Sequence, residues 1–461
     1  LDNIQKEVSI FKANSEVHKS DLLNAVSNGS LTLCIGSGVT RGLVGEWNDL
    51  LNEIASSLFY RKIMEKYLGK DNSNGAIGLT GSDVHDFLNN LWGGFPDTTN
   101  VLEKGEYLAA QCDKGPLEQK KKTQCSDSFD TTPNWRELVF AEITLDVSRW
   151  LIANNISKNM RSLDPSKEKN VDLAKLEEYL IDYYLEMVNH RDEISKKGQT
   201  MAKDDCFRTI ETLEAIISLC FSGKVRHIIN YNFDTILETL LSSEKVSEYY
   251  KPKGGKSLQL EVYNPFYNHE NPLDIFIGNT IPEEHHSIRI DHVHGLLDGR
   301  LEQISPIVFS EESYVSIRRA ALHWSSLAIA KAITEGLMLC IGFSGEDDDF
   351  RTICQRMMEN KQMGCANMEA TMNYKSHIYL VASLKSRIGK IRKPLEKKIE
   401  ERSHLVGTEP EITDKEKICT HELFIGYIEM VEQYFKNHFD VQIIWVEDRP
   451  NIPTLLQELN V

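Results

Sequence analysis

Two short polar clusters in this chain carry side chains that could do chemistry. His294 lies in the run Asp291–Gly295, and a histidine titrates close enough to neutral pH to act as a general base. Asn232 and Asp234 flank a phenylalanine at the end of another apolar run. A neutral amide and a carboxylate two residues apart can orient a carboxamide or a water molecule. We therefore take His294, Asn232 and Asp234 as the catalytic candidates, with Asn230 as a secondary one.

Both clusters also have a structural interpretation. A single histidine is more often structural than catalytic, and His292 shares a strand face with His294 because side chains along a strand alternate with period two. Asp234 or Thr235 could cap the helix that follows. Thr235 and Glu238 have the spacing of a capping box, which supports a helix start here. A cap can sit beside a site, so the two interpretations are compatible.

A glycine-containing loop follows the apolar run at residues 31–35. Its residues Gly36, Ser37 and Gly38 would let the backbone approach a pyrophosphate and offer N–H groups to its oxygens. The spacing is not Gly-x-Gly-x-x-Gly, so a plain tight turn is the alternative. Another apolar run, residues 339–341, also ends in small and polar residues. Four such strand ends in order suggest a nucleotide site, because parallel α/β sheets present functional groups there.

Metal binding is the less favoured chemistry. The carboxylates at 347–349 suit the first turn of a helix, where they complement its dipole. The nine cysteines are irregularly spaced without a Cys-x-x-Cys pair, which argues against both a zinc site and a disulfide framework. Cys34 and Cys340 lie inside apolar runs and fit buried hydrophobic positions. We expect no metal and no zinc.

Strand-like and helix-like segments alternate along most of the chain. Strands are predicted at 31–35, 225–231, 288–294, 337–342, 377–382 and 441–446. Helices are predicted at 20–28, 46–58, 234–241, 311–335, 347–359 and 422–437. This alternation predicts an α/β fold with a Rossmann-like, doubly wound parallel sheet.

Residues 61–219 contain no clear strand, and the block is far longer than an ordinary connection. Its helical segments are predicted at 101–110, 135–153, 171–189 and 205–221. We therefore expect residues 1–60 and 220–461 to form the Rossmann domain, with 61–219 as a large helical insertion.

The net charge and the lack of long apolar runs limit the classes of binding partner that we expect. The net charge of −17 disfavours direct binding to nucleic acid, because such a surface repels phosphate backbones. No apolar run reaches the roughly 18 residues needed to cross a bilayer. The first residues, 1–6, lack the apolar stretch of a signal peptide. We expect a cytoplasmic protein without a membrane partner.

Taken in order, these motifs resemble those of the sirtuin-like family of NAD-consuming proteins. Gly36-Ser37-Gly38 resembles the family's Gly-Ala-Gly, and Asn232-Phe233-Asp234 resembles its Asn-Ile-Asp. His294-Gly295 looks like the catalytic His-Gly. Gly342-Phe343-Ser344 is similar to the Gly-Thr-Ser that binds the nucleotide.

Departures from the family pattern refine what the resemblance implies. Protein deacylases of this family carry a four-cysteine zinc module after His-Gly, but no cysteine lies between Gly295 and Cys340. The family's Pro-Asp-Phe-Arg is also lacking, which puts acyl-lysine recognition in doubt. The run Val308–Tyr314 instead resembles bacterial antiphage effectors of the Thoeris type or those paired with HerA-class ATPases.

The resemblance implies an NAD+ hydrolase that releases nicotinamide and ADP-ribose and depletes NAD+ after infection. His294 would activate water or a ribose hydroxyl, Asn232 would place that water or the ribose, and Asp234 would help hold the carboxamide. The pyrophosphate and adenosine side would bind to Gly36, Ser37, Gly38, Gly342 and Ser344. NAD+ is then a substrate rather than a recycled cofactor.

Oligomers are common among these relatives, so the resemblance also implies a homo-oligomer, with a HerA-class ATPase as a candidate partner. Two other function classes stay open. One is a catalytically silent subunit that senses NAD or ADP-ribose, and the other is a protein deacylase or ADP-ribosyltransferase.

Overall fold

The centre of the protein is a seven-stranded sheet in which every strand pair is parallel. The computed structural model describes residues 19–45, 50, 53–54, 135–163, 175–191, 205–250, 258–263, 286–297, 307–309, 313–315, 323–364, 377–386, 414–449 and 451–460. The strands are β1 (Leu31–Ile35), β2 (Val225–Asn230), β3 (Leu258–Tyr263), β4 (His286–His292), β5 (Leu337–Ile341), β6 (Ile378–Ser383) and β7 (Val441–Val446).

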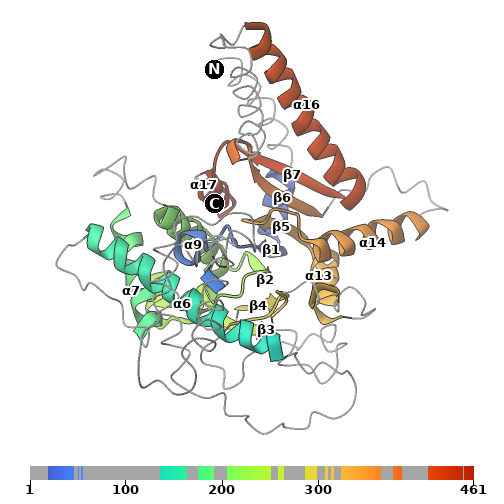
Figure 1. The fold of residues 1–461 in the computed structure, drawn as a ribbon. Coiled ribbons are helices and arrows are strands. Elements are labelled where there is room, and N and C mark those ends of the chain that lie inside the picture. The colour runs from blue at the N-terminus through green and yellow to red at the C-terminus, as the bar shows by residue number, and fades with distance from the viewer. Residues whose placement is uncertain are drawn as a thin grey trace, which may run out of the picture.

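The strand order β3-β4-β2-β1-β5-β6-β7 places β1 at a switch point. The chain places β2, β3 and β4 on one side of β1, with β4 inserted between β2 and the edge strand β3, and then crosses back to form β5 on the other side (Figure 1). The loops after β1 and β5 therefore leave the same edge of the sheet, where parallel α/β folds bind ligands. The prediction of an α/β, Rossmann-like parallel sheet is confirmed.

Helices cover both faces of the sheet, which is why its central strands β1 and β5 are buried along their whole length. Leu33 and Ile35 of β1 face one hydrophobic cluster, and Cys34 between them faces the other. The first face carries α2 (Arg41–Val44), α7 (Leu176–Asn189), α9 (Asp205–Phe221), α10 (Ile236–Ser242), α11 (Glu244–Tyr250) and α17 (Asn451–Leu459). The second face carries α13 (Trp324–Glu335), α14 (Asp348–Gly364) and α16 (Asp414–Phe439).

The long helix α6 (Trp135–Leu163) contacts two clusters. Its C-terminal half packs with the first face, while Ala141, Ile143 and Val147 pack on Phe233 and Leu297 beyond the ends of β2 and β4. This places α6 beside the carboxyl edge of the sheet. Because α7 and α9 share one hydrophobic cluster with β1 and β2, these two helices belong to the packing of the sheet. The domain boundaries at 61 and 219 stay a prediction.

Several helix and strand boundaries in the structure differ from those predicted from the sequence. The strand predicted to 294 ends at His292, and the helix predicted over 311–335 is not continuous, because His323 is extended and α13 begins at Trp324. The prediction missed β3, α11 and α17; β3 is a partly buried edge strand with weak apolar patterning. The helix predicted at 101–110 and most of that at 46–58 lie outside the described residues.

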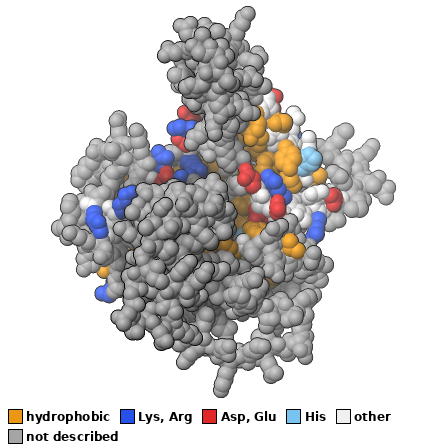
Figure 2. Space-filling view, in the orientation of Figure 1, with side chains coloured by type: hydrophobic (Ala, Val, Ile, Leu, Met, Phe, Trp, Pro, Cys, Tyr) orange, Lys and Arg blue, Asp and Glu red, His pale blue; other side chains and the backbone are white. Residues whose placement is uncertain are grey.

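The surface beside the C-terminal end of α16 is partly apolar. Met430 and Tyr434 lie about one helical turn apart and are 59% and 43% exposed. Figure 2 shows hydrophobic side chains gathered in this part of the described surface. None of the helices in the described part of the chain is both long enough and apolar enough to cross a membrane.

Gly336, which links α13 to β5, gives a test of the packing. A Cβ there would overlap the carbonyl oxygen of Ser30, a backbone atom that cannot swing away. We expect Gly336→Ala to lower the free energy of unfolding by roughly 1–3 kcal/mol, measured by urea denaturation. Gly426→Ala in exposed α16 is the control, because its Cβ meets no described atom within 4 Å. That control should gain roughly 0.5–1 kcal/mol; equal stability of both variants would contradict the packing argument.

Candidate active site

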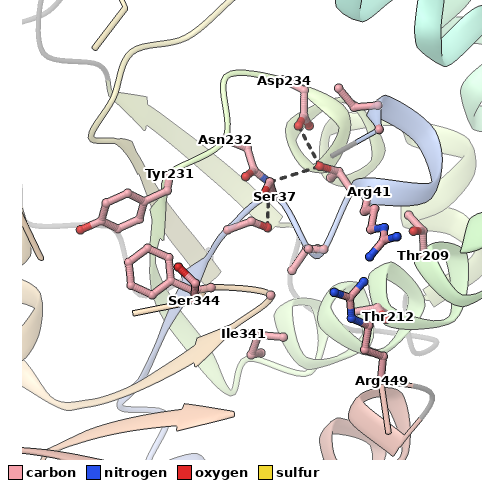
Figure 3. A pocket seen from close by; sticks show the side chains of 18 of the residues that line it. Ser37, Arg41, Thr209, Thr212, Tyr231, Asn232, Asp234, Ile341, Ser344 and Arg449 are labelled. Carbon is pink, nitrogen blue, oxygen red and sulfur yellow. Dashed lines mark hydrogen bonds between the residues drawn. The ribbon is translucent and has the colours of Figure 1, made fainter. Parts of the chain in front are cut away.

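A pocket of about 650 Å³ opens at the carboxyl ends of the central strands. Its volume lies within the range of small-molecule sites. All eight predicted site residues line it: Gly36, Ser37, Gly38, Asn232, Asp234, His294, Gly342 and Ser344. They follow the ends of different strands, separated by up to three hundred residues of sequence. Figure 3 shows four of them, Ser37, Asn232, Asp234 and Ser344, around the pocket. The structure therefore brings the predicted set together, while the role of each residue stays a prediction.

The loops after β1 and β5 touch through their backbones. Gly36 N donates to Ile341 O at 3.1 Å, and Gly38 N donates to Gly342 O at 2.9 Å. A Cβ on Gly36 or Gly38 would lie 2.7 or 2.8 Å from the backbone of Gly342, so both positions need glycine. Gly342 itself has φ 61°, which glycine adopts without strain. The contact leaves the neighbouring Ser37 and Ser344 exposed at the pocket.

Asn232 presents a free acceptor to the pocket. Its Nδ2 donates to the carbonyl oxygen of Gly36 at 3.2 Å and to Thr40 Oγ1 at 3.3 Å. Its Oδ1 is buried and has no hydrogen-bond partner among the described residues. A buried amide oxygen left unpaired costs free energy, so it is poised to accept from a ligand hydroxyl, amide or water.

Asp234 is held at the base of the same loop. Its carboxylate accepts from Thr40 Oγ1 at 3.0 Å and from the backbone N–H of Ile236 at 3.2 Å. Burial raises the pKa of Asp234 to about 6, and the nearby Glu238 carboxylate adds to the rise. Thr235 makes no side-chain cap to α10, so of the two candidate caps it is Asp234 that accepts from the first turn.

The helix start that the Thr235–Glu238 spacing predicted is confirmed, because α10 begins at Ile236, but the capping box itself does not form. Glu238 is 3% exposed and points away from the helix start, toward the ring of His292 at 2.7 Å. A buried carboxylate needs a charged or hydrogen-bonding partner, and β4 supplies one that spacing within α10 does not show.

His294 sits in an aromatic enclosure just past β4. Its ring makes edge contacts with Tyr231 and Tyr314, with centroids 4.8 and 5.2 Å away. Its Nδ1 lies 3.5 Å from Tyr314 Oη, and its Nε2 lies 3.5 Å from Asp347 Oδ2. Burial lowers the pKa of His294, and Asp347 offsets only part of that. The imidazole is therefore neutral at pH 7, as a general base requires.

The two histidines do not share a face, contrary to prediction. Because β4 ends at His292 and Gly295 turns the chain with φ 95°, the alternation of the strand does not reach His294. His292 is fully buried beneath the Asn232 loop, whereas His294 lines the pocket.

One group in the described part of the chain could hold a metal ion. Ligand atoms of His294, Asp347 and Asp349 lie within 4.8 Å of one another. Asp347 already accepts from the backbone N–H of Phe350 at 2.9 Å and from Tyr314 Oη at 3.4 Å, so it caps α14 and orders the aromatic wall. Asp348 and Asp349 occupy the first turn of α14, as predicted.

Sequence reasoning missed several pocket residues. Tyr231 and Asp347 carried no motif signal for the pocket, and Arg449 comes from the far end of the chain. Figure 3 shows the guanidinium groups of Arg41 and Arg449 pointing toward each other at one end of the pocket. Arg41 also lies 3.5 Å from Asp205. Two facing cations favour an anionic ligand between them.

Comparison with known families supports the resemblance. Residues 226–397 match the family of SIR2-like domains. The matched segment runs from β2 through β6 and contains Asn232, Asp234, His294, Gly342 and Ser344. A search of curated proteins finds no match. The match supports a sirtuin-like family for this segment and is consistent with NAD-related activity.

We expect the purified protein to contain far less than one zinc ion per chain. The one acid–histidine group described has its central carboxylate, Asp347, committed to two hydrogen bonds. Elemental analysis would measure the metal, and melting temperatures with and without a chelator would show whether any metal supports the fold. Stoichiometric zinc that disappears in Asp349→Asn would contradict this expectation.

Proposed function

We propose that this protein is an NAD+ hydrolase that releases nicotinamide and ADP-ribose. The observation that carries the proposal is the convergence of a neutral, buried His294 and an unpaired Asn232 Oδ1 on a pocket whose floor is two touching glycine loops. The match to SIR2-like domains supports an NAD-related substrate.

The pocket suits a dinucleotide. Ser37 and Ser344 offer hydroxyl groups beside closely approaching backbone, and Arg41 and Arg449 add positive charge to a chain of net charge −17. A pyrophosphate between the two guanidinium groups would relieve their mutual repulsion. The nicotinamide-ribose would then extend toward the aromatic wall around His294.

The chemistry is a balanced hydrolysis. The C–N bond between ribose and nicotinamide breaks, its electron pair leaves with nicotinamide, and the ribose develops oxocarbenium character. Water adds to the anomeric carbon and gives its proton to His294, either directly or after relay by a ribose hydroxyl. Asn232 Oδ1 accepts a hydrogen bond from that water or ribose, and the Asp234 carboxylate favours the positive charge of the reacting sugar and helps hold the carboxamide.

Water is the acceptor in this proposal, because no cysteine lies between Gly295 and Cys340, where the deacylases of the family carry their four-cysteine module. A silent sensor of NAD or ADP-ribose would have no need of a buried neutral histidine facing the pocket.

We further propose that NAD+ depletion serves antiphage defence in the cytoplasm. An unregulated NAD+ hydrolase would harm its own cell, so activity should depend on assembly. A homo-oligomer, or a complex with a HerA-class ATPase, would provide that control. The exposed Met430 and Tyr434 on α16 are an observation in favour of a protein contact.

Incubation with NAD+ alone should yield nicotinamide and ADP-ribose in equal amounts, measured by chromatography. The reason is that the acid–base and positioning groups are present while an acyl-lysine module is not. A strict requirement for an acetyl-lysine peptide would overturn the proposal in favour of deacylation. Binding of NAD+ without turnover, in every assembly state, would instead favour the sensor.

His294→Ala and Asn232→Ala should each lower kcat about 10²–10⁴-fold, through loss of the base and of positioning. His190→Ala is the matched control, because His190 is exposed at the C-cap of the first-face helix α7. Turnover and melting temperature would be measured for all three. Wild-type rates in a well-folded His294→Ala would remove its assignment as the base.

The kcat/KM for NAD+ cleavage should fall as the pH drops below 7. His294 must be neutral and Asp234 ionised; burial lowers the pKa of His294 below its usual value and raises that of Asp234 to about 6. Both groups are therefore in their working forms at pH 7, and kcat/KM should be half lost near pH 6 as they take up protons. In the Asp234→Asn variant, the loss of kcat/KM at low pH should follow the protonation of His294 alone. An acid limb centred above pH 7 would contradict these assignments.

A further inference from the structure

A buried network lies directly beneath Asn232. His292 Nε2 contacts Glu238 Oε1 at 2.7 Å, and His292 Nδ1 donates to the backbone carbonyl of Asn232 at 3.0 Å. Asn230 completes the network: its Oδ1 accepts from the backbone N–H of Asn232 at 2.9 Å, and its Nδ2 donates to Glu238 Oε1 at 3.3 Å. Glu238 Oε1 is therefore bonded to both His292 and Asn230, the two residues that hold the backbone of Asn232.

Both backbone groups of Asn232 are therefore held by side chains rather than by the sheet. Each of the three supporting residues is at most 3% exposed. With its backbone fixed on both sides, Asn232 directs its side chain toward the Gly36 loop and the pocket, where Nδ2 bonds to the Gly36 carbonyl.

The network has a defined charge arrangement. A carbonyl oxygen only accepts, so Nδ1 of His292 carries a hydrogen. Burial lowers the pKa of His292, but the Glu238 charge and hydrogen bond raise it by more, so the pKa lies above its ordinary value and a second proton on the Glu238 side is favoured. An imidazolium–carboxylate pair is directional on both sides of the ring and resists rotation.

We propose that Glu238 and His292 are positioning residues that set the angle of Asn232 in the pocket through its backbone. The proposal rests on the hydrolase function proposed above for what that angle achieves. Neither residue lines the pocket, so they act through Asn232 rather than on the substrate.

The same sheet offers a matched comparison. His227 and Asp291, on β2 and β4, also form a buried histidine–carboxylate pair at 2.7 Å. Asp291 is bound on its other side by Arg289 Nε, at 2.9 and 3.0 Å. Within the described residues, the side-chain hydrogen bonds of Asp291 go to His227 and Arg289, not to the Asn232 loop. This second pair stabilises strands without touching the candidate site.

The test compares Glu238→Gln and His292→Gln with Asp291→Asn and His227→Gln in the full-length chain. The first two should lower the kcat of NAD+ cleavage by up to about 100-fold, as expected for a misplaced reacting group, with little change in KM. The double variant should lose no more than either single variant, because both changes break one network. The comparison pair should lose melting temperature while keeping kcat within about twofold of wild type.

Hydrogen exchange gives a readout that does not need turnover. The peptide covering residues 230–236 should exchange faster in Glu238→Gln and His292→Gln than in the comparison pair. If wild type does not cleave NAD+, the hydrolase proposal fails, and this measurement still decides the positioning role. If Glu238→Gln does not fold, His292→Gln carries the test.

Three results would overturn the proposal. The first is wild-type kcat and exchange in a folded Glu238→Gln or His292→Gln variant. The second is an equal loss of kcat in Asp291→Asn, which would make the effect general destabilisation. The third is failure of both network variants to fold while the comparison pair folds, which would make the network a folding element rather than a positioning one.

Discussion

The backbone contact between the loops after β1 and β5 is the constraint on which the candidate site depends. Gly38 N meets Gly342 O at 2.9 Å, an approach that side chains at Gly36 or Gly38 would prevent. This contact joins the two loops at the switch point of the sheet. The side chain of Asn232 bonds to the Gly36 carbonyl in the same place. Thr40, a few residues on, ties the loop to Asp234. One close approach of glycines therefore fixes the loop to which both catalytic candidates from β2 attach.

The central strands and the site residues could be predicted from the sequence for the same reason. Parallel strands covered on both faces are almost continuously apolar, so the central strands β1 and β5 stand out, and the polar residues after them must gather at one edge. The edge strand β3 lacks that signal, because its burial is only partial and its sequence is mixed. Arg449 could not be predicted as a pocket residue, since it follows the last strand and no motif marks it.

Glu238 shows why spacing alone misleads. Four residues in a row matched a capping box, but that rule counts positions along one helix and ignores what packs on it. In the folded chain Glu238 faces the sheet, and its partner His292 is 54 residues away in sequence. The cost of burying an unpaired carboxylate exceeds the gain from a helix cap, so the distant histidine decides where the side chain goes.

His292 and His294 are two residues apart and equally enclosed, yet they are suited to opposite tasks. Burial alone would keep both rings neutral. His292 has a carboxylate oxygen at 2.7 Å, which raises its pKa, whereas the nearest carboxylate to His294 Nε2 is at 3.5 Å and does not offset burial. His292, whose Nδ1 donates to the Asn232 carbonyl, holds that backbone group in place, whereas His294, whose pKa is lowered, can accept a proton. The end of β4 at His292 sets this division, because it sends one ring under the Asn232 loop and the other into the pocket.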